Sequence, residues 1–257
     1  MPLLPVRSGP LSPKELYLFD TMGYLRMPGF ISPATAEDCR AEVRTLPSHL
    51  MKGRGDKERF DDLTRHSARF DALARSEPLL DCVRPVINQP LRLIESYGLR
   101  RTGDSRFYLH NGFSEVFPYG RGRTARRNMS FQHTYHDGHL YCMFVKLLLY
   151  LTDVASAEDG PFCCLQGSHK ANFPWFPDTK AFSRRPALTT ENFPSLDIVP
   201  AGTGDALLLN EALFHGTLPK STECERLVLA FSYAPAFVTD WAEIDVDSED
   251  IAKVGHY

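Results

Sequence analysis

The strongest constraint on the fold is a change of pattern near residue 90, where a helical first third gives way to short apolar runs. Clusters of Gly, Pro and Asp separate these runs, as they do between the strands of all-β folds. The sequence predicts strands over residues 91–97, 106–110, 144–151, 161–165, 206–210 and 227–233. Helices followed by many short strands favour an antiparallel sandwich or jelly roll (a cupin-like, mainly β fold) with an N-terminal helical flank.

Helix-start signals are clear in the first third. From Ser12 the chain reads Ser-Pro-Lys-Glu, which combines an N-cap, a proline at the first helical position and a capping box. A second Ser-Pro start lies at Ser32, and a third helical stretch is expected near residues 70–87. Residues 24–27, between the first two helices, predict a short strand.

Length and composition fit one globular unit. The chain has 257 residues, of which 43% are hydrophobic and 24% charged, enough apolar mass for a sizeable core. We expect a single domain over residues 1–257, with the helical flank over about 12–88 and the jelly-roll core over about 90–238.

Charge and targeting signals exclude several classes of partner. The net charge is -3, so nothing in the bulk favours a nucleic acid polymer or an anionic membrane. The first residues lack a signal peptide pattern, and no apolar stretch of about 18 residues is present. We expect a cytoplasmic protein with six reduced cysteines, a monomer or small homo-oligomer that acts on a small molecule.

His215 is a candidate metal ligand. It follows a turn and the predicted strand over 206–210 and precedes Gly216 and Thr217. Eleven residues further on, Arg226 opens another apolar strand, and a hairpin of that length can place it opposite His215. A strand histidine beside a buried arginine would bind a metal and a dicarboxylate together. A structural histidine with a surface arginine fits the same spacing.

His110 is the second candidate, at the end of the predicted strand over 106–110 and before Asn111-Gly112. Taken alone, it reads as a histidine at a turn. Three more histidines follow in the segment over 133–139.

Several motifs follow one another in a characteristic order. They are FDTMGYL (19–25), PGFIS (28–32), YLTDV (150–154), DGPF (159–162), GSHK (167–170), Gly204-Asp205, His215-Gly216-Thr217 and Arg226. Together they resemble the phytanoyl-CoA dioxygenase family of Fe(II)/2-oxoglutarate oxygenases over about residues 15–238. Gln166 departs from the pattern, because a proline is usual there.

The resemblance implies a double-stranded β-helix in which two histidines and an Asp or Glu hold Fe(II). It also implies that His215 is the second histidine ligand, that Arg226 binds the distal carboxylate of 2-oxoglutarate, and that Thr217 adds a hydrogen bond. Two neutral imidazoles and a carboxylate occupy one face of the iron, which leaves the opposite face for 2-oxoglutarate and O₂.

One motif departs from the family in a way that bears on chemistry. Where the family has His-x-Asp, this chain has His110-Asn111-Gly112, and glycine has no side chain to coordinate iron. The chain thereby resembles the halogenases of this class, in which chloride binds in the position left by the missing carboxylate. We therefore expect a halogenase that uses Fe(II), 2-oxoglutarate, O₂ and chloride, with the halide beside Gly112.

Other assignments stay open. His133 or His136 could replace His110 as the first histidine ligand. Asp137 or Glu211 could supply a carboxylate, which would make the protein a hydroxylase. A metal-free binding protein on the same fold is the third possibility.

The substrate is constrained only weakly. Arg123, Arg126 and Arg127 lie among glycines in a loop that is solvated in most proteins, but clustered guanidiniums also bind phosphate. A phosphorylated or nucleotide-like metabolite would suit them, with His133 lining the substrate pocket.

Overall fold

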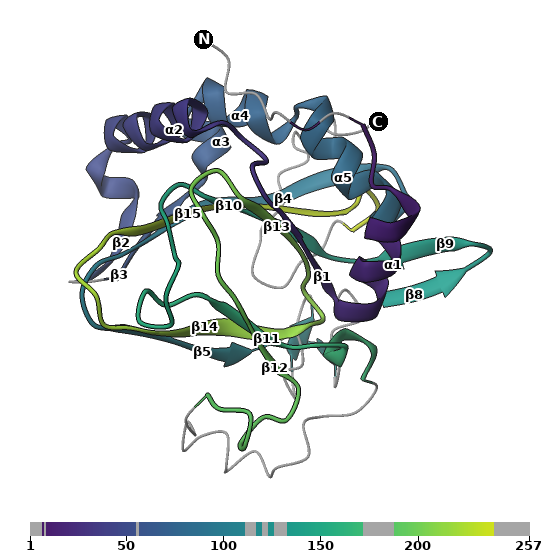
Figure 1. Ribbon diagram of the computed structural model, residues 1–257. Coiled ribbons are helices and arrows are strands. Elements are labelled where there is room, and N and C mark those ends of the chain that lie inside the picture. Colours follow the sequence, from purple (N-terminus) through teal and green to yellow (C-terminus); the bar gives the residue numbers. More distant parts are fainter. Residues whose placement is uncertain are drawn as a thin grey trace.

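The protein is described by a computed structural model that covers residues 7, 9–54, 57–110, 117–119, 123–125, 133–171 and 188–238. Two antiparallel sheets face each other, and helices cover the outer face of the larger sheet (Figure 1). This arrangement is a jelly roll with a helical flank, which confirms the predicted fold class.

The first two helices begin at the predicted caps, Ser12 and Ser32, whereas the stretch expected near 70–87 forms two helices, and the short helix before it was not predicted. Their bounds are α1 Pro13–Met22, α2 Pro33–Thr45, α3 Leu63–His66, α4 Ala68–Ala74 and α5 Glu77–Ile87. In α1 the Ser12 hydroxyl accepts from the Glu15 amide, and the Glu15 carboxylate accepts from the Ser12 amide at 2.8 Å. Gly23 ends α1 with φ 85, a left-handed conformation that favours glycine. None of the described helices is long and apolar enough to cross a membrane.

The larger sheet has seven strands in the order β1-β13-β10-β15-β4-β3-β2. Their bounds are β1 Tyr24–Met27, β13 Ala206–Asn210, β10 Val145–Tyr150, β15 Arg226–Pro235, β4 Leu91–Arg101, β3 Lys57–Asp61 and β2 Met51–Arg54. The first strand of this sheet precedes the jelly-roll core in sequence, so the N-terminal flank contributes strands as well as helices.

The smaller sheet has four strands in the order β12-β11-β14-β5. They are β12 Leu196–Val199, β11 Phe162–Leu165, β14 Phe214–Lys220 and β5 Ser105–His110. Two hairpins stand apart from both sheets: β6 Phe117–Tyr119 with β7 Arg123–Ala125, and β8 His133–His136 with β9 His139–Cys142. Within the smaller sheet, β14 and its neighbour β5 contribute the two histidines of the candidate site.

The core has two layers, and β10 shows why. Leu147 and Leu149 belong to the cluster that packs against the helices, whereas Leu148 and Tyr150 belong to the cluster between the two sheets. Successive strand residues point to opposite faces, so a strand covered on both sides reads as a continuous apolar run. Each such buried side chain contributes about 2 kcal/mol to folding. The polar residues of the candidate site are set into the layer between the sheets.

Candidate metal and cosubstrate site

His215 and His110 face each other on neighbouring strands of the smaller sheet. β14 and β5 pair antiparallel, and their register places His215 opposite His110. The centroids of the two rings lie 4.4 Å apart, with 51° between the ring planes. His215 is buried and His110 is exposed. The structure therefore brings together the two histidines that the sequence singled out.

The tautomer of His215 suits a metal ligand. Its Nδ1 lies 2.8 Å from the carbonyl oxygen of Leu213, and a carbonyl can only accept, so Nδ1 carries the proton. The lone pair of the neutral ring is then on Nε2. Burial, followed by the charge of His110, lowers the pKa of His215 to about 3. The imidazole is neutral at neutral pH, which is the form that binds metals.

Glu211 is the carboxylate that acts electrostatically on this pair. It is buried directly after β13, and its Oε1 lies 2.8 Å from the Nζ of Lys146. Burial opposes its charge, but Lys146, His215 and His110 hold its pKa below the ordinary value. Across the described residues, no three His, Cys, Asp or Glu side chains converge on a metal position. As placed, Glu211 is held by Lys146 rather than coordinating with the histidines.

The hairpin of β8 and β9 holds the other candidate ligands away from the pair. His133 donates from Nε2 to Asp20 Oδ1 at 2.8 Å, and its Nδ1 lies 2.9 Å from Asn210 Nδ2. Both ring nitrogens of His133 are therefore engaged by side chains of the protein, and its roles as a metal ligand or substrate contact stay predictions from the sequence. His136 and Asp137 pair with each other at the exposed turn of the hairpin, which points away from β14 and β5 (Figure 1).

His133 instead belongs to a buried structural cluster. Its ring meets His169 edge-on, with 4.7 Å between centroids. The Nε2 of His169 donates to the carbonyl of Asp20 at 2.9 Å, and Lys170 Nζ donates to the Asp20 carboxylate at 3.0 Å. These bonds tie helix α1 to the turn η3 (Ser168–Lys170) and to the hairpin.

Arg226 lies between the two sheets, but not where the sequence analysis placed it. The expected hairpin opposite His215 is wrong, because β14 and β15 belong to different sheets. Arg226 is the first residue of β15, and its partner across the strands is Arg101, the last residue of β4. The chain crosses from one sheet to the other between Lys220 and Arg226.

Arg226 is a buried cation without a carboxylate partner among the described residues. Its side chain is 3% exposed, and its Nε has no hydrogen-bond partner. The guanidinium carbon lies 5.7 Å from the centroid of the Tyr150 ring, and the side chains of Tyr150 and Arg226 interact. Burial lowers the pKa of Arg226, and the groups that oppose this are Tyr150 and Cys163. A buried unpaired charge is costly, so the surroundings of Arg226 fit an incoming carboxylate such as that of 2-oxoglutarate.

Thr217 lies on the same strand as His215 and contacts a second buried arginine, Arg101. It follows His215 by two positions along β14, and the regular pairing with β11 places both side chains on one face of the sheet. Its Oγ1 accepts a hydrogen bond of 2.6 Å from Arg101 Nη1. Sequence reasoning missed Arg101, since Arg100-Arg101-Thr102-Gly103 reads as a polar strand end.

The side chains of the remaining predicted site residues are outside the part of the chain that the structure describes. Gly112, Arg126 and Arg127 are outside the described residues, and for Arg123 only the backbone, in β7, is described. The halide position and the arginine loop therefore remain predictions from the sequence.

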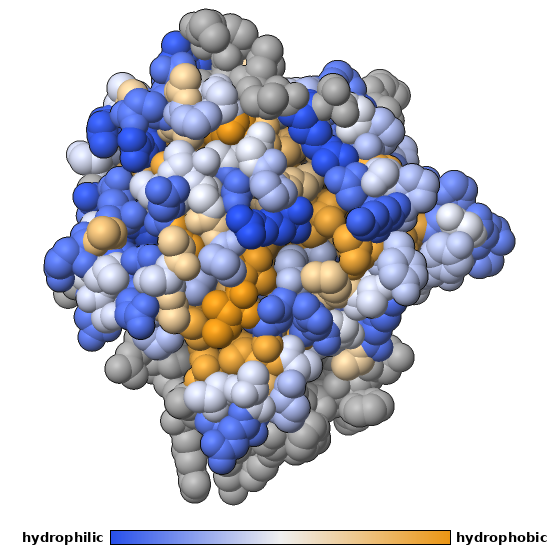
Figure 2. Space-filling model, in the orientation of Figure 1, coloured by the Kyte–Doolittle hydropathy of each residue, from blue (hydrophilic) through white to orange (hydrophobic). Residues whose placement is uncertain are grey.

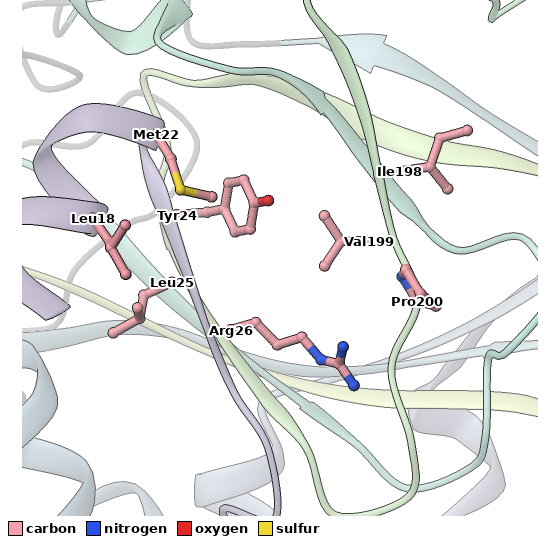
Figure 3. Close-up of a pocket in the computed structure, with 8 residues that line it drawn as sticks. All are labelled: Leu18, Met22, Tyr24, Leu25, Arg26, Ile198, Val199 and Pro200. Carbon is pink, nitrogen blue, oxygen red and sulfur yellow. The ribbon is translucent and has the colours of Figure 1, made fainter.

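A separate pocket opens at the edge of the sandwich, between β1 and β12 (Figure 3). It has a volume of about 330 Å³, and its lining is mainly apolar, with Leu18, Met22, Tyr24 and Val199 among the contributors. Apolar side chains gather on the same face of the molecule, over the seam between the sheets (Figure 2). None of the residues lining this pocket belongs to the histidine pair or the arginine site.

Comparisons with known proteins show the family. The model of the phytanoyl-CoA dioxygenase (PhyH) family matches residues 19–228. The chain is similar to HygX from Streptomyces hygroscopicus, solved with nickel and 2-oxoglutarate bound. The two sequences are 46% identical, the match covers 94% of each chain, and the TM-score is 0.81. HygX with nickel, 2-oxoglutarate and hygromycin B bound is 47% identical over 94% of each chain, with a TM-score of 0.80.

More distant structures show the same fold. EctD from S. alaskensis with bound Fe is 16% identical, covers 92% of this chain and 82% of its own, and has a TM-score of 0.62. A comparison with curated protein sequences gives no match. The family match spans most of the chain, and the jelly roll agrees with it. The chain therefore belongs to the phytanoyl-CoA dioxygenase family of Fe(II)- and 2-oxoglutarate-dependent oxygenases.

Proposed function

We propose that this protein binds Fe(II) through His110 and His215, binds 2-oxoglutarate through Arg226 and Thr217, and oxidises a C–H bond of a small molecule. The observation that carries the proposal is the cross-strand pair of His215 and His110, with a buried arginine in the facing sheet whose Nε is unpartnered. When bound, iron with 2-oxoglutarate and O₂ supplies an oxidising power that amino-acid side chains lack.

The protein's own residues position and shield the reactants. The Leu213 carbonyl fixes the tautomer of His215, and the Phe162 ring stacks on its imidazole with 5.9 Å between centroids. Both contacts hold the ring in one orientation before a metal arrives. Arg226 offers a planar fork that matches a carboxylate with two hydrogen bonds. Its burial excludes competing water, which strengthens that ion pair.

The proposed substrate is a compound similar to hygromycin B. The support is HygX, which is 47% identical over 94% of both chains and was solved with hygromycin B bound. A phosphorylated metabolite is the weaker choice, since it rests on the sequence of the arginine loop alone. Calorimetric titration of the protein loaded with Ni(II) and 2-oxoglutarate separates the two: hygromycin B should bind and a nucleoside monophosphate should not. The reverse result would favour the phosphorylated class.

Two outcomes of the oxidation differ in the third ligand of the metal. A carboxylate as third ligand would favour insertion of oxygen. Glu211 is the candidate, since it is buried, is held by Lys146, and its charge interacts with both histidines. Halogenation is the second candidate function, favoured by Gly112 in the His-x-Gly motif. We rank oxygen insertion first, because the charge of this buried carboxylate acts on both histidines, whereas Gly112 lies outside the described residues.

The experiment is an anaerobic titration of Fe(II) and 2-oxoglutarate, followed by the visible absorption band of their chelate. A band that chloride leaves unchanged supports oxygen insertion. A band that shifts saturably with chloride supports halogenation, and Gly112→Asp should then abolish the shift. The absence of any band would contradict the enzymatic proposal and favour a metal-free binding protein.

A further inference from the structure

Two buried arginines lie side by side at the proposed cosubstrate site. Arg101 ends β4, Arg226 begins β15, and the two are cross-strand partners. They are 1% and 3% exposed. Only one of them, Arg226, is accounted for by the proposed function, on which the present inference rests.

The two guanidinium charges act on each other in the core. Burial, and then the charge of Arg226, lowers the pKa of Arg101 to about 10. Two like charges in a poorly solvated interior repel each other, and an anion bound beside them would offset that repulsion.

The hydrogen bond between Arg101 and Thr217 has a fixed direction. A guanidinium has donors and no acceptor, so Arg101 Nη1 donates to Thr217 Oγ1, at 2.6 Å. The hydroxyl hydrogen of Thr217 must then point away from Arg101. Thr217 is thereby prepared to donate to another acceptor, and a carboxylate bound by Arg226 is an acceptor of the right kind.

The surroundings hold Arg101 in this orientation. Gly160 has φ 72, and a Cβ atom there would lie 3.0 Å from Arg101 Nη1 and 3.1 Å from the carbonyl oxygen of Leu218. The glycine thus leaves the space that the guanidinium fills. Arg101 Nη2 also reaches the Leu218 carbonyl, at 3.5 Å. The side chain is enclosed on the side away from Thr217.

We propose that Arg101 is a positioning residue for 2-oxoglutarate: it turns the Thr217 hydroxyl toward the distal carboxylate and adds a second positive charge beside Arg226. The consequence is selectivity. Arg101 should matter for 2-oxo acids that carry a distal carboxylate and be indifferent to those that lack one. 2-Oxopentanoate has the same chain length as 2-oxoglutarate and no distal carboxylate, so it is the matched probe.

The test measures binding by calorimetric titration of the Ni(II)-loaded protein with each 2-oxo acid. Arg101→Gln should weaken 2-oxoglutarate by roughly 10- to 100-fold, the effect of losing a charged hydrogen bond, and leave 2-oxopentanoate unchanged. Arg100→Gln is the control, because Arg100 forms ion pairs with Glu58 and Glu225 away from the site. It should bind both acids like the unchanged protein.

A second set of variants shows whether Arg101 acts through Thr217. In a Thr217→Val background the Arg101→Gln effect should shrink, because contacts that act together are not additive. If Arg101→Gln fails to fold, Arg101→Lys replaces it; it keeps the charge but loses the fork, and should still weaken 2-oxoglutarate selectively.

The outcomes separate the two proposals. If the unchanged protein does not bind 2-oxoglutarate, the proposed function itself fails. If it binds and the Arg101 variants bind equally well, or lose both acids to the same extent, the role of Arg101 is overturned while the function stands.

Discussion

Lys146 and Glu211 form a buried ion pair beside the histidine pair, with 2.8 Å between Nζ and Oε1. Glu95 is the other carboxylate near Lys146, at 3.8 Å, and the ring of Tyr97 lies 5.3 Å from its Nζ. Burial disfavours the charge on Lys146, but Glu211 holds the pKa of the lysine above its ordinary value. Each member of the pair therefore depends on the other to remain charged in the core.

This dependence predicts a stability effect. Lys146→Met should lower the free energy of unfolding by about 3–5 kcal/mol, because it leaves the carboxylate of Glu211 buried and unpaired. Adding Glu211→Met should recover part of the loss, since neither charge then remains. Urea unfolding of the metal-free protein measures both. A double variant less stable than the single one would show that the pair is not the source of the loss.

The burial of Arg226 without a carboxylate predicts stabilisation by the cosubstrate. With Ni(II) present, 2-oxoglutarate at about one hundred times its Kd should add about 2.7 kcal/mol. For a chain of this size that raises the Tm by about 5–10 °C. Arg226→Gln should abolish the shift, and Arg100→Gln should retain it. A similar shift in the Arg226 variant would place the distal carboxylate elsewhere.

The buried ring of His169 predicts acid sensitivity. Burial, together with the charges of His133 and Lys170, lowers the pKa of His169 to about 4, while the carbonyl and carboxylate of Asp20 oppose this shift. The unfolded chain takes up a proton near pH 6.5, whereas the folded ring takes it up only near pH 4. Between these values the unfolded state binds more protons, so stability falls as the pH falls.

The loss of stability caused by His169 at low pH can be measured by comparison with His169→Gln. His169 should account for up to about 3 kcal/mol of lost stability between pH 6.5 and 4. His169→Gln keeps an amide donor for the Asp20 carbonyl and does not titrate. Urea unfolding at a series of pH values should show a shallower decline for this variant. An unchanged slope would assign the acid sensitivity to other groups.

Local signals predicted local structure well. The capping box of Ser12 and Glu15 and the stop at Gly23 set α1, because these hydrogen bonds lie within a few residues. The buried strands β10 and β13 were found as continuous apolar runs. In contrast β14 was missed, since Phe214–Lys220 contains Gly216 and Pro219 and shows no alternation of polar and apolar residues.

The candidate site was predictable only in part, because its geometry comes from the sheets. His110 and His215 ended or followed recognisable strands, and a register between β5 and β14 brings them together. The placement of Arg226 failed because a short connection was taken for a hairpin, whereas the chain changes sheets there. The role of Arg101 could not be predicted from the sequence, because its partners Thr217 and Arg226 lie far from it along the chain.

If His110 and His215 hold the iron, the visible band of the anaerobic Fe(II)–2-oxoglutarate complex depends on both side chains. The band should form in the unchanged protein and disappear in both His110→Ala and His215→Ala. His136→Ala should keep the band, since His136 lies at the exposed turn of the β8–β9 hairpin. A band that survives His110→Ala and disappears with His136→Ala would contradict the account and move the first ligand to the hairpin.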